Sequence, residues 1–499
     1  DLRWGDMSAE PFPSLIIGVD DLRPQGAYAR AQADYLQPDE DAVARITEQL
    51  RRNEVGVVSH YYMDPELQGV LLASDWPHVH ISDSLMMADA AIEMARKGAR
   101  SIVVLGVDFM SENVRAMLDA FGFPDVPVYR VASDPIGCSL AEAADSLRYG
   151  AWLTGAAKTP RSLHVVYVNT SLRTKAKAEA LVPTITCTSS NVIRTIMQAA
   201  AQIPDLHVWY GPDTYMGHNL RRFFTRLAEL GDEAVRAVHA EHDSATVQGL
   251  VERLHTFEQG VCIVHHMFGA DVAERLRRDY ADAYVTAHLE VPGEMFELGL
   301  AAQSEGRGVV GSTADILTFI RKRVGEAASA RQTQRLRFVL GTEAGMITSI
   351  VRDVQKVLRE HRDAGGSTVE AEIVFPVASD AVAASNDAQL GIVPGVVGGE
   401  GCSVAGGCAT CPYMKMNSLD ALSDVLDGIE RDPSRLTRHH PAAYAESITG
   451  PDGRRVSIAE LGSRTIVAMR SFQRSGRLPD ELVRDVLDRR PSLVAADGA

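Results

Sequence analysis

The chain has 499 residues, of which 45 % are hydrophobic and 23 % charged, and a length of this order predicts two to four globular domains. A formal net charge of −16 argues against nucleic acid or an anionic membrane surface as a partner. We expect no signal peptide and no membrane span, because no apolar run approaches the ~18 residues that a span requires. Six cysteines are too few for a disulfide scaffold and indicate a reducing compartment.

Short apolar runs recur along the chain and predict buried parallel strands, because neither face of them is polar. These runs are "SIVVLG" (101–106), "LHVVYVN" (163–169), "LHVWYG" (206–211), "VCIVHH" (261–266) and "EIVFPV" (372–377). Helical patterns that begin at capping residues alternate with them: "DSLMMADAAIEMARKG" (83–98), "SSNVIRTIMQAAAQI" (189–203) and "STADILTFIRKRV" (312–324). The alternation predicts an α/β fold with a ligand site where strands end and helices begin.

The alternation of strands and helices along the chain also predicts the domain organisation. We expect an N-terminal extension at 1–40, a first α/β domain at 41–135, a second at 136–255, further α/β segments at 256–425 and a helical appendage at 426–499. Polar or small residues at 359–372 and 377–391 predict surface insertions.

Cys138 precedes Ser139 and Glu142, a pair that predicts a capping box and a helix beginning at once. The positive end of that helix would lower the pKa of the thiol and favour a thiolate ligand. Cys262 precedes His265 and His266, which raises the odds of a polar site. The alternative interpretation makes both cysteines, like Cys187, ordinary core residues.

Three further cysteines lie in "GEGCSVAGGCATCPYMKMN" (399–417), a glycine-rich loop. A structural zinc site would need a second pair with the spacing of Cys408 and Cys411, and the sequence has none. The Cys411–Pro412 step is a weak hint of iron–sulfur binding. Spacing alone does not decide between a local metal site, a disulfide, and one cysteine that serves a site built elsewhere.

Many segments of the chain occur in the order found in one enzyme family: "SHYYMDPELQGV", "ISDSL", "GVDFMSEN", "GCSLAEAAD", "CTSSN", "CIVHHMFG", "AHLEVPGE", "GSTADI" and "CPYMKMNSL". Across roughly 45–425 the sequence resembles quinolinate synthase, in particular the plant-type branch. The chain reads His288–Leu289–Glu290 where the family commonly has histidine–proline–glutamate, and we expect it to lack the N-terminal sulfur-transfer activator domain of many plant-type members.

The resemblance implies three similar three-layer αβα domains with small parallel sheets around a central cluster site. It implies condensation of iminoaspartate with dihydroxyacetone phosphate to quinolinate, phosphate and water in NAD biosynthesis. It also implies a [4Fe–4S] cluster held by Cys138, Cys262 and Cys411, with one open iron as Lewis acid. Cys402 and Cys408 are then left as a redox pair or as bystander thiols.

The resemblance further implies roles for individual residues. Tyr62 is the expected acid/base. Glu290 is expected to be a general base or a partner of a cluster-bound hydroxyl, and His288 is expected to bind substrate or relay protons. The expected substrate-binding set is His60, Ser84, Tyr167, Asn169, Ser189, His288, Glu290, Ser312 and Thr313. Without the resemblance, the serines would be interpreted as helix caps and Tyr167 as core.

Two alternatives stay open at this stage. The first is a structural zinc or redox-switch protein that uses Cys402, Cys408 and Cys411. The second is a cluster enzyme with altered substrates. The resemblance also implies a functional link to L-aspartate oxidase and to sulfur-transfer or cluster assembly proteins, and it leaves a homodimer open. The expected location is the cytoplasm of a bacterium or the plastid stroma of a plant or alga.

Overall fold

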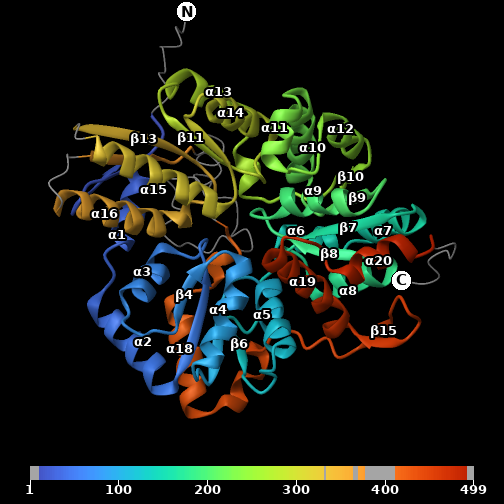
Figure 1. Ribbon diagram of the computed structural model, residues 1–499. Coiled ribbons are helices and arrows are strands. Elements are labelled where there is room, and N and C mark those ends of the chain that lie inside the picture. Colours follow the sequence, from blue (N-terminus) through green and yellow to red (C-terminus); the bar gives the residue numbers. More distant parts are fainter. Residues whose placement is uncertain (1–10, 331–332, 364–368, 377–410, 492–499) are drawn as a thin grey trace, which may run out of the picture.

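A computed structural model describes residues 11–330, 333–363, 369–376 and 411–491 of the chain (Figure 1). The described residues form three α/β domains, each built on its own sheet, and the C-terminal segment packs against the first two (Figure 1). None of the described helices combines the length and the apolar character needed to cross a membrane.

The first sheet has four parallel strands in the order β4-β3-β5-β6. Its strands and the helices around it, drawn in blue in Figure 1, are α2 (Glu40–Asn53), β3 (Val55–His60), α3 (Pro65–Ala73), β4 (Val79–Ser82), α4 (Ser84–Arg96), β5 (Ser101–Leu105), α5 (Asp108–Ala120) and β6 (Val128–Arg130). All residues of β3 and β5 are buried, as expected of strands covered on both faces.

The second sheet is also parallel, in the order β10-β9-β7-β8. Its elements are α6 (Ser139–Ala144), α7 (Leu147–Lys158), β7 (Ser162–Tyr167), α8 (Leu172–Leu181), β8 (Thr184–Cys187), α9 (Val192–Gln202), β9 (His207–Gly211), α10 (Thr214–Glu229), α11 (Asp232–Val238), α12 (Ser244–Glu252) and β10 (Leu254–Thr256). Cys187, expected to be structural, lies fully buried in β8.

The third sheet has six strands in the order β12-β11-β13-β14-β1-β2, and β1 pairs antiparallel with both of its neighbours. Its elements are β1 (Ser14–Ile17), β2 (Leu22–Gln25), α1 (Ala27–Tyr35), α13 (Ala270–Asp279), β11 (Tyr284–His288), α14 (Gly293–Ser304), β12 (Gly308–Gly311), α15 (Thr313–Ser329), β13 (Gln334–Gly341), α16 (Ile347–Asp363) and β14 (Val369–Val374). The beginning of the chain, expected to be an extension, therefore supplies two strands of this sheet.

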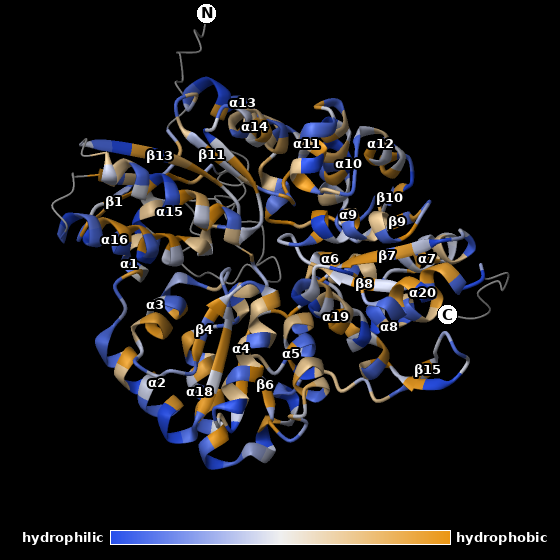
Figure 2. Ribbon diagram, viewed as in Figure 1, coloured by the Kyte–Doolittle hydropathy of each residue, from blue (hydrophilic) through white to orange (hydrophobic). Residues whose placement is uncertain are grey.

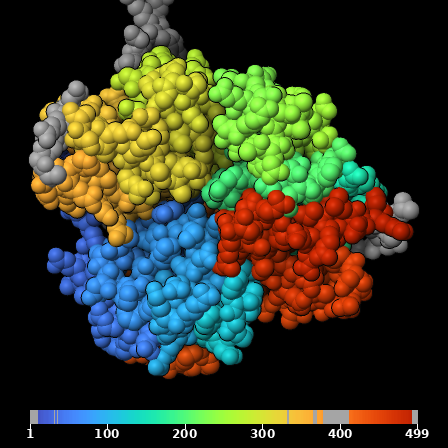
Figure 3. Space-filling view, in the orientation of Figure 1, coloured from blue at the N-terminus to red at the C-terminus, as the bar shows by residue number. Residues whose placement is uncertain are grey.

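The C-terminal segment, drawn in red, lies over the second domain and beside the first (Figure 3). Its elements are α18 (Leu419–Arg431), η5 (Pro433–His439), β15 (Ser447–Thr449), β16 (Arg455–Ser457), α19 (Ile458–Ser475) and α20 (Asp480–Asp488). Helix α19 packs on α8, where Leu461 is fully buried beside Ala176. The segment is mostly helical, and it is an integral part of the packing between domains.

The strands expected at 101–106, 163–169, 206–211 and 372–377 are confirmed as β5, β7, β9 and β14. The strand expected at 261–266 is wrong. This stretch is a loop followed by the short 3₁₀ helix η1 (His265–Met267), in which His266 N–H donates to the Cys262 carbonyl. Val264 is buried in the cavity wall instead of in a sheet, and Ile263 is exposed.

The expected helix starts are confirmed for α4, capped by Asp83, and for α15, where Ser312 and Asp315 form a capping box. Helix α9 begins at Val192 and not at 189, because the Asn191 side chain accepts the Thr188 N–H and closes a turn before it. The capping box expected at Ser139 is wrong, since the Ser139 hydroxyl donates to the Val261 carbonyl.

The surface insertion expected at 359–372 is wrong for its described parts, because 359–363 complete α16 and 369–372 belong to β14. The insertion expected at 377–391, together with Cys402 and Cys408, lies outside the described residues. Apolar residues concentrate in the strands and on the inward faces of the helices, whereas the outer helix faces are hydrophilic (Figure 2).

Candidate active site

A cavity of about 70 Å³ is lined by residues of all three domains. The carboxyl ends of the parallel strands face it: β3 ends at His60, β7 at Tyr167 and β11 at His288. The cavity is lined by every site residue predicted from the sequence except Ser312, namely His60, Tyr62, Ser84, Cys138, Tyr167, Asn169, Ser189, Cys262, His288, Glu290, Thr313 and Cys411. Residues far apart in the chain are thus brought to one place.

Cys138, Cys262 and Cys411 line this cavity together, and each lies immediately before a short helix. Cys138 is the N-cap residue of α6, Cys262 precedes η1, and Cys411 precedes the 3₁₀ helix η4 (Met414–Met416). Backbone N–H groups of the following residues donate to each sulfur: those of Leu140, Ala141, His265, Tyr413 and Met414. Such N–H donors stabilise a thiolate and suit a cysteine that holds iron.

Burial dominates the acidity of these thiols. It raises the pKa of Cys138 to about 11 and that of Cys411 to about 12, and it raises the pKa of Cys262 well above the usual value of a thiol. The expectation of a lowered pKa at Cys138 is therefore wrong, because the N–H groups at the start of α6 only partly offset burial. Ionising three neighbouring half-buried thiols is favoured by a positively charged partner, and a metal cluster fits this set of donors.

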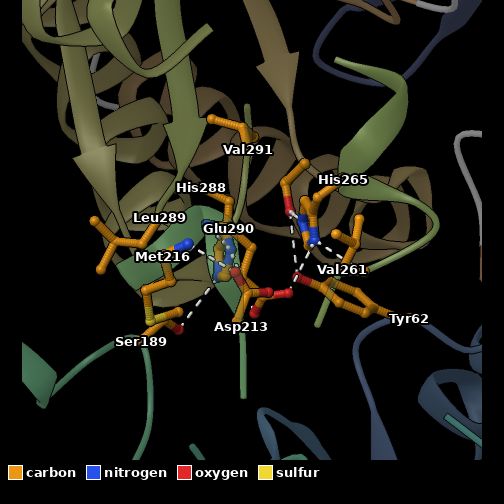
Figure 4. Close-up of polar contacts among 12 residues, drawn as sticks. Tyr62, Ser189, Asp213, Met216, Val261, His265, His288, Leu289, Glu290 and Val291 are labelled. Carbon is orange, nitrogen blue, oxygen red and sulfur yellow. Dashed lines mark hydrogen bonds and ion pairs between the residues drawn. The ribbon is translucent and has the colours of Figure 1, made fainter. Parts of the chain in front are cut away.

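Glu290 is the hub of the polar contacts in the cavity (Figure 4). Its carboxylate accepts a hydrogen bond from the Tyr167 hydroxyl and lies 3.1 Å from Nδ1 of His265. His288 Nδ1 lies 3.7 Å from the same carboxylate, and its Nε2 is 3.2 Å from the Ser189 hydroxyl. The imidazoles of His265 and His288 are stacked with centroids 4.8 Å apart.

These contacts set the protonation of Glu290. Burial by itself would raise its pKa, but the facing His265 and His288 and the hydrogen bond from Tyr167 bring the pKa down to about 2. Burial lowers the pKa of His288 to about 4, against the attraction of Glu290. The pair therefore presents a carboxylate and a neutral imidazole near neutral pH.

Tyr62 reaches the cavity from the loop after β3. Its hydroxyl lies 3.3 Å from the hydroxyl of Thr313 and 3.2 Å from that of Thr342, both in the third domain. Burial, together with the negative charge of Glu290, raises the pKa of Tyr62, so the phenol holds its proton. His60 Nδ1 accepts the Tyr62 N–H, and burial lowers the pKa of His60 to about 3.

Three helix starts face the cavity. Ser84 is the first residue of α4, Ser189 lies in the turn before α9, and Thr313 is the first residue of α15. Helix N-termini carry partial positive charge and unpaired N–H groups, which suits anionic substrates. The Ser312 hydroxyl instead donates to Asp315 within the capping box, so the structure does not bring it to the cavity.

His265 is a site residue that the sequence did not single out. Its side chain is 1 % exposed and contacts Cys262 Sγ at 3.3 Å and the Thr342 hydroxyl at 3.4 Å. Ligand atoms of Cys262, His265 and Glu290 lie within 4.8 Å of one another, close enough to hold a single metal ion. The two histidines that follow Cys262 were the only signal for it.

Glu343 and Asn417 support the cysteine segment from opposite sides. The fully buried Glu343 carboxylate accepts N–H groups of Cys411 at 3.1 Å and Gly345 at 2.7 Å. Asn417, 1 % exposed, accepts the Gly106 N–H and donates to the Gly106 carbonyl, both at 3.2 Å. Cys411 is thereby tied to the third and the first domain together.

Comparison with known proteins gives the family. Residues 44–364 match the family model described as "Quinolinate synthetase A protein". The chain belongs to the quinolinate synthase family. The family resemblance and the enzyme class expected from the sequence motifs are thus confirmed. Cys138 and Cys262 lie within the matched range, and Cys411 follows it.

The chain is 50 % identical over 497 residues to a protein from Nicotiana tabacum named "Quinolinate synthase, chloroplastic", covering 98 % of this chain and 68 % of that one. It is 51 % identical over 505 residues to a protein of the same name from Oryza sativa subsp. japonica, covering 97 % and 70 %. A quinolinate synthase from Cyanothece sp. is 27 % identical over 328 residues, or 65 % and 79 % of the two chains. The similarity to the plant proteins of the family therefore extends across Cys411 and the C-terminal segment.

Proposed function

We propose that the chain, as a quinolinate synthase of NAD biosynthesis, condenses iminoaspartate with dihydroxyacetone phosphate, and that Cys138, Cys262 and Cys411 hold a [4Fe–4S] cluster in the central cavity. The products are quinolinate, phosphate and two water molecules. The observation that carries the proposal is the meeting of three half-buried cysteines with Glu290, His288 and Tyr62 around one cavity.

Bound through three cysteines, the cluster supplies a Lewis acid at its fourth iron. The protein positions the substrates around it. The starts of α4, α9 and α15 provide N–H groups and the hydroxyls of Ser84, Ser189 and Thr313 for carboxylates and phosphate. Asn169, at the end of β7, adds an amide donor for a substrate carboxylate.

Glu290 serves as the general base, because its carboxylate stays ionised beside His265 and accepts a hydrogen bond from Tyr167. Tyr62 is the general acid. Its hydroxyl lies between the hydroxyls of Thr313 and Thr342 and holds its proton. His288 Nδ1 accepts the Glu290 N–H at 3.3 Å, so its Nε2 faces the Ser189 hydroxyl at 3.2 Å, where the neutral imidazole binds substrate or relays a proton.

The first experiment is an anaerobic purification with an absorbance spectrum and counts of iron and sulfide, repeated for Cys138→Ser, Cys262→Ser and Cys411→Ser. A brown protein with about four irons per chain, lost in all three variants, supports the ligand assignment. Metal that survives in the Cys138→Ser and Cys262→Ser proteins would contradict it and favour a zinc or redox site in the loop that holds Cys402 and Cys408.

Turnover completes the test. The wild-type protein should form quinolinate from iminoaspartate and dihydroxyacetone phosphate without oxygen, whereas an intact cluster without quinolinate would favour altered substrates. L-aspartate oxidase and sulfur-transfer or cluster assembly proteins are the functional partners that we expect. The chloroplastic names of the plant relatives support the plastid stroma for a plant or algal source.

A further inference from the structure

Lys175 in α8 is fully buried, which is unusual for a lysine. Its ammonium donates to the carbonyl of Val168 at 3.1 Å and to the carbonyl of Thr170. These two carbonyls flank Asn169, which is one of the residues that line the cavity. The charge therefore lies behind the turn that presents Asn169.

Two site residues lie in or next to the turn whose carbonyls accept hydrogen bonds from Lys175. Tyr167 donates to Glu290, and Asn169 faces the substrate cavity two residues later. Within the turn, Thr170 N–H donates to the Val168 carbonyl at 2.7 Å, and the Thr170 hydroxyl donates to the Tyr167 carbonyl at 3.1 Å. Without the ammonium, the carbonyls on either side of Asn169 would lose a charged donor in a buried place.

Acidic groups face Lys175 from two other elements. Burial lowers the pKa of Lys175 to about 7, while the carboxylates of Glu112 in α5 and Asp145 after α6 act in the opposite direction. Glu112 accepts the Leu172 N–H at 3.0 Å and the Tyr444 hydroxyl at 2.8 Å, the latter from the C-terminal segment.

We propose that Lys175 is a positioning residue for substrate binding: through its hydrogen bonds to the Val168 and Thr170 carbonyls, its ammonium fixes the backbone of the turn so that the Asn169 amide meets a carboxylate of the dicarboxylate substrate. This inference rests on the proposed function and deepens it. Lys175 touches neither substrate nor cluster, and its effect passes through Asn169.

The decisive variant is Lys175→Met, which keeps an unbranched side chain of similar length and removes the donor. Lys177→Met is the matched control, because Lys177 lies on the same helix and is exposed. We expect a tenfold or larger rise in the Kd of quinolinate, measured by calorimetry, and in the KM for iminoaspartate formed from oxaloacetate and ammonia; tenfold corresponds to about 1.4 kcal/mol. Iron per chain, the KM for dihydroxyacetone phosphate and kcat should stay within twofold of wild type, as should all values for Lys177→Met.

A double-mutant cycle with Asn169→Ala tests whether Lys175 acts through Asn169. If it does, the double variant binds quinolinate no more weakly than Asn169→Ala alone. Effects that multiply would overturn the inference, because a general loosening of the domain adds to the loss of Asn169. Unchanged quinolinate binding in a folded Lys175→Met protein would overturn it as well.

Glu112→Gln keeps the test decisive should Lys175→Met fail to fold. Glutamine preserves an acceptor for the Leu172 N–H, removes the charge that faces Lys175 and turns an NH₂ group toward the Tyr444 hydroxyl, which can accept from it. A rise of threefold or more in the same Kd supports the inference, and an unchanged Kd overturns it. A wild-type protein that forms no quinolinate would instead refute the proposed function, so the two failures are distinguishable.

Discussion

Asn417 should control how firmly the chain holds the third cysteine. It follows η4, its side chain is 1 % exposed, and its amide nitrogen donates to the carbonyls of Gly106 at 3.2 Å and Met414 at 3.0 Å. Its amide oxygen accepts the Gly106 N–H at 3.2 Å. Asn417→Asp has the same shape, but it turns an oxygen toward both carbonyls.

The cost follows from the lost donors. A buried carbonyl left without a hydrogen bond costs about 1–3 kcal/mol, so two of them give about 2–6 kcal/mol, to which a buried carboxylate adds. If about 2–4 kcal/mol of this weakens the attachment of residues 411–417, that segment opens roughly 30- to 700-fold more often, at tenfold for each 1.4 kcal/mol.

The assay follows iron release to a chelator without oxygen, by absorbance, in wild type, Asn417→Asp and Asn417→Ala. We expect loss at least about tenfold faster in both variants. Asn53→Asp is the control, because Asn53 bonds only the nearby Gln49 carbonyl at the end of α2 in the first domain. Release at the wild-type rate in both Asn417 variants would refute the reasoning that this amide anchors Cys411.

Three further predictions concern other parts of the molecule. Tyr62→Phe should keep its iron and lose at least about a hundredfold in kcat, as expected when a general acid is removed; undiminished turnover would rule out the acid role. Leu461→Ala, at a fully buried position of α19, should destabilise the packing on α8 by about 2–5 kcal/mol and speed proteolysis of the C-terminal segment, whereas the exposed Leu487→Ala should not. Burial raises the pKa of Glu179 from 4.5 to about 7, against the attraction of Arg489. Between these pH values the folded protein keeps a proton that the unfolded chain has lost. The free energy of unfolding therefore falls as the pH rises from about 4.5 to about 7. Glu179→Gln should remove this loss, up to about 3 kcal/mol in unfolding experiments at pH 5 and pH 8; equal slopes for the two proteins would contradict the buried titration.

The strands at the core of each sheet could be predicted because they are apolar on both faces, as at β5 and β7. The same pattern misled at 261–266, where Val264 lies in a cavity wall and Ile263 is exposed. Strand β1 gave no local signal, because its partner β14 lies at the other end of the third domain, with Ser14 opposite Val374. A short stretch of sequence does not specify pairing with a strand that lies far away along the chain.

The site itself was predicted through family motifs, and the exceptions have physical causes. His265 and His266 are neighbours with the same composition around them, yet His265 turns inward to Glu290 and His266 turns outward to Tyr215. Only the fold of η1 decides between them. Ser312 matched a motif, but its hydroxyl is engaged by Asp315 at the start of α15.

The position of Cys411 near the end of the chain bears on how the enzyme is made. During synthesis the first two domains and most of the third can fold before this cysteine leaves the ribosome, since domains generally fold as units from the N-terminus. Of the three proposed ligands, a nascent chain therefore offers only Cys138 and Cys262 to an iron donor. With the proposed ligand set, delivery of the cluster must wait until translation is nearly complete, and chains that terminate early cannot retain it.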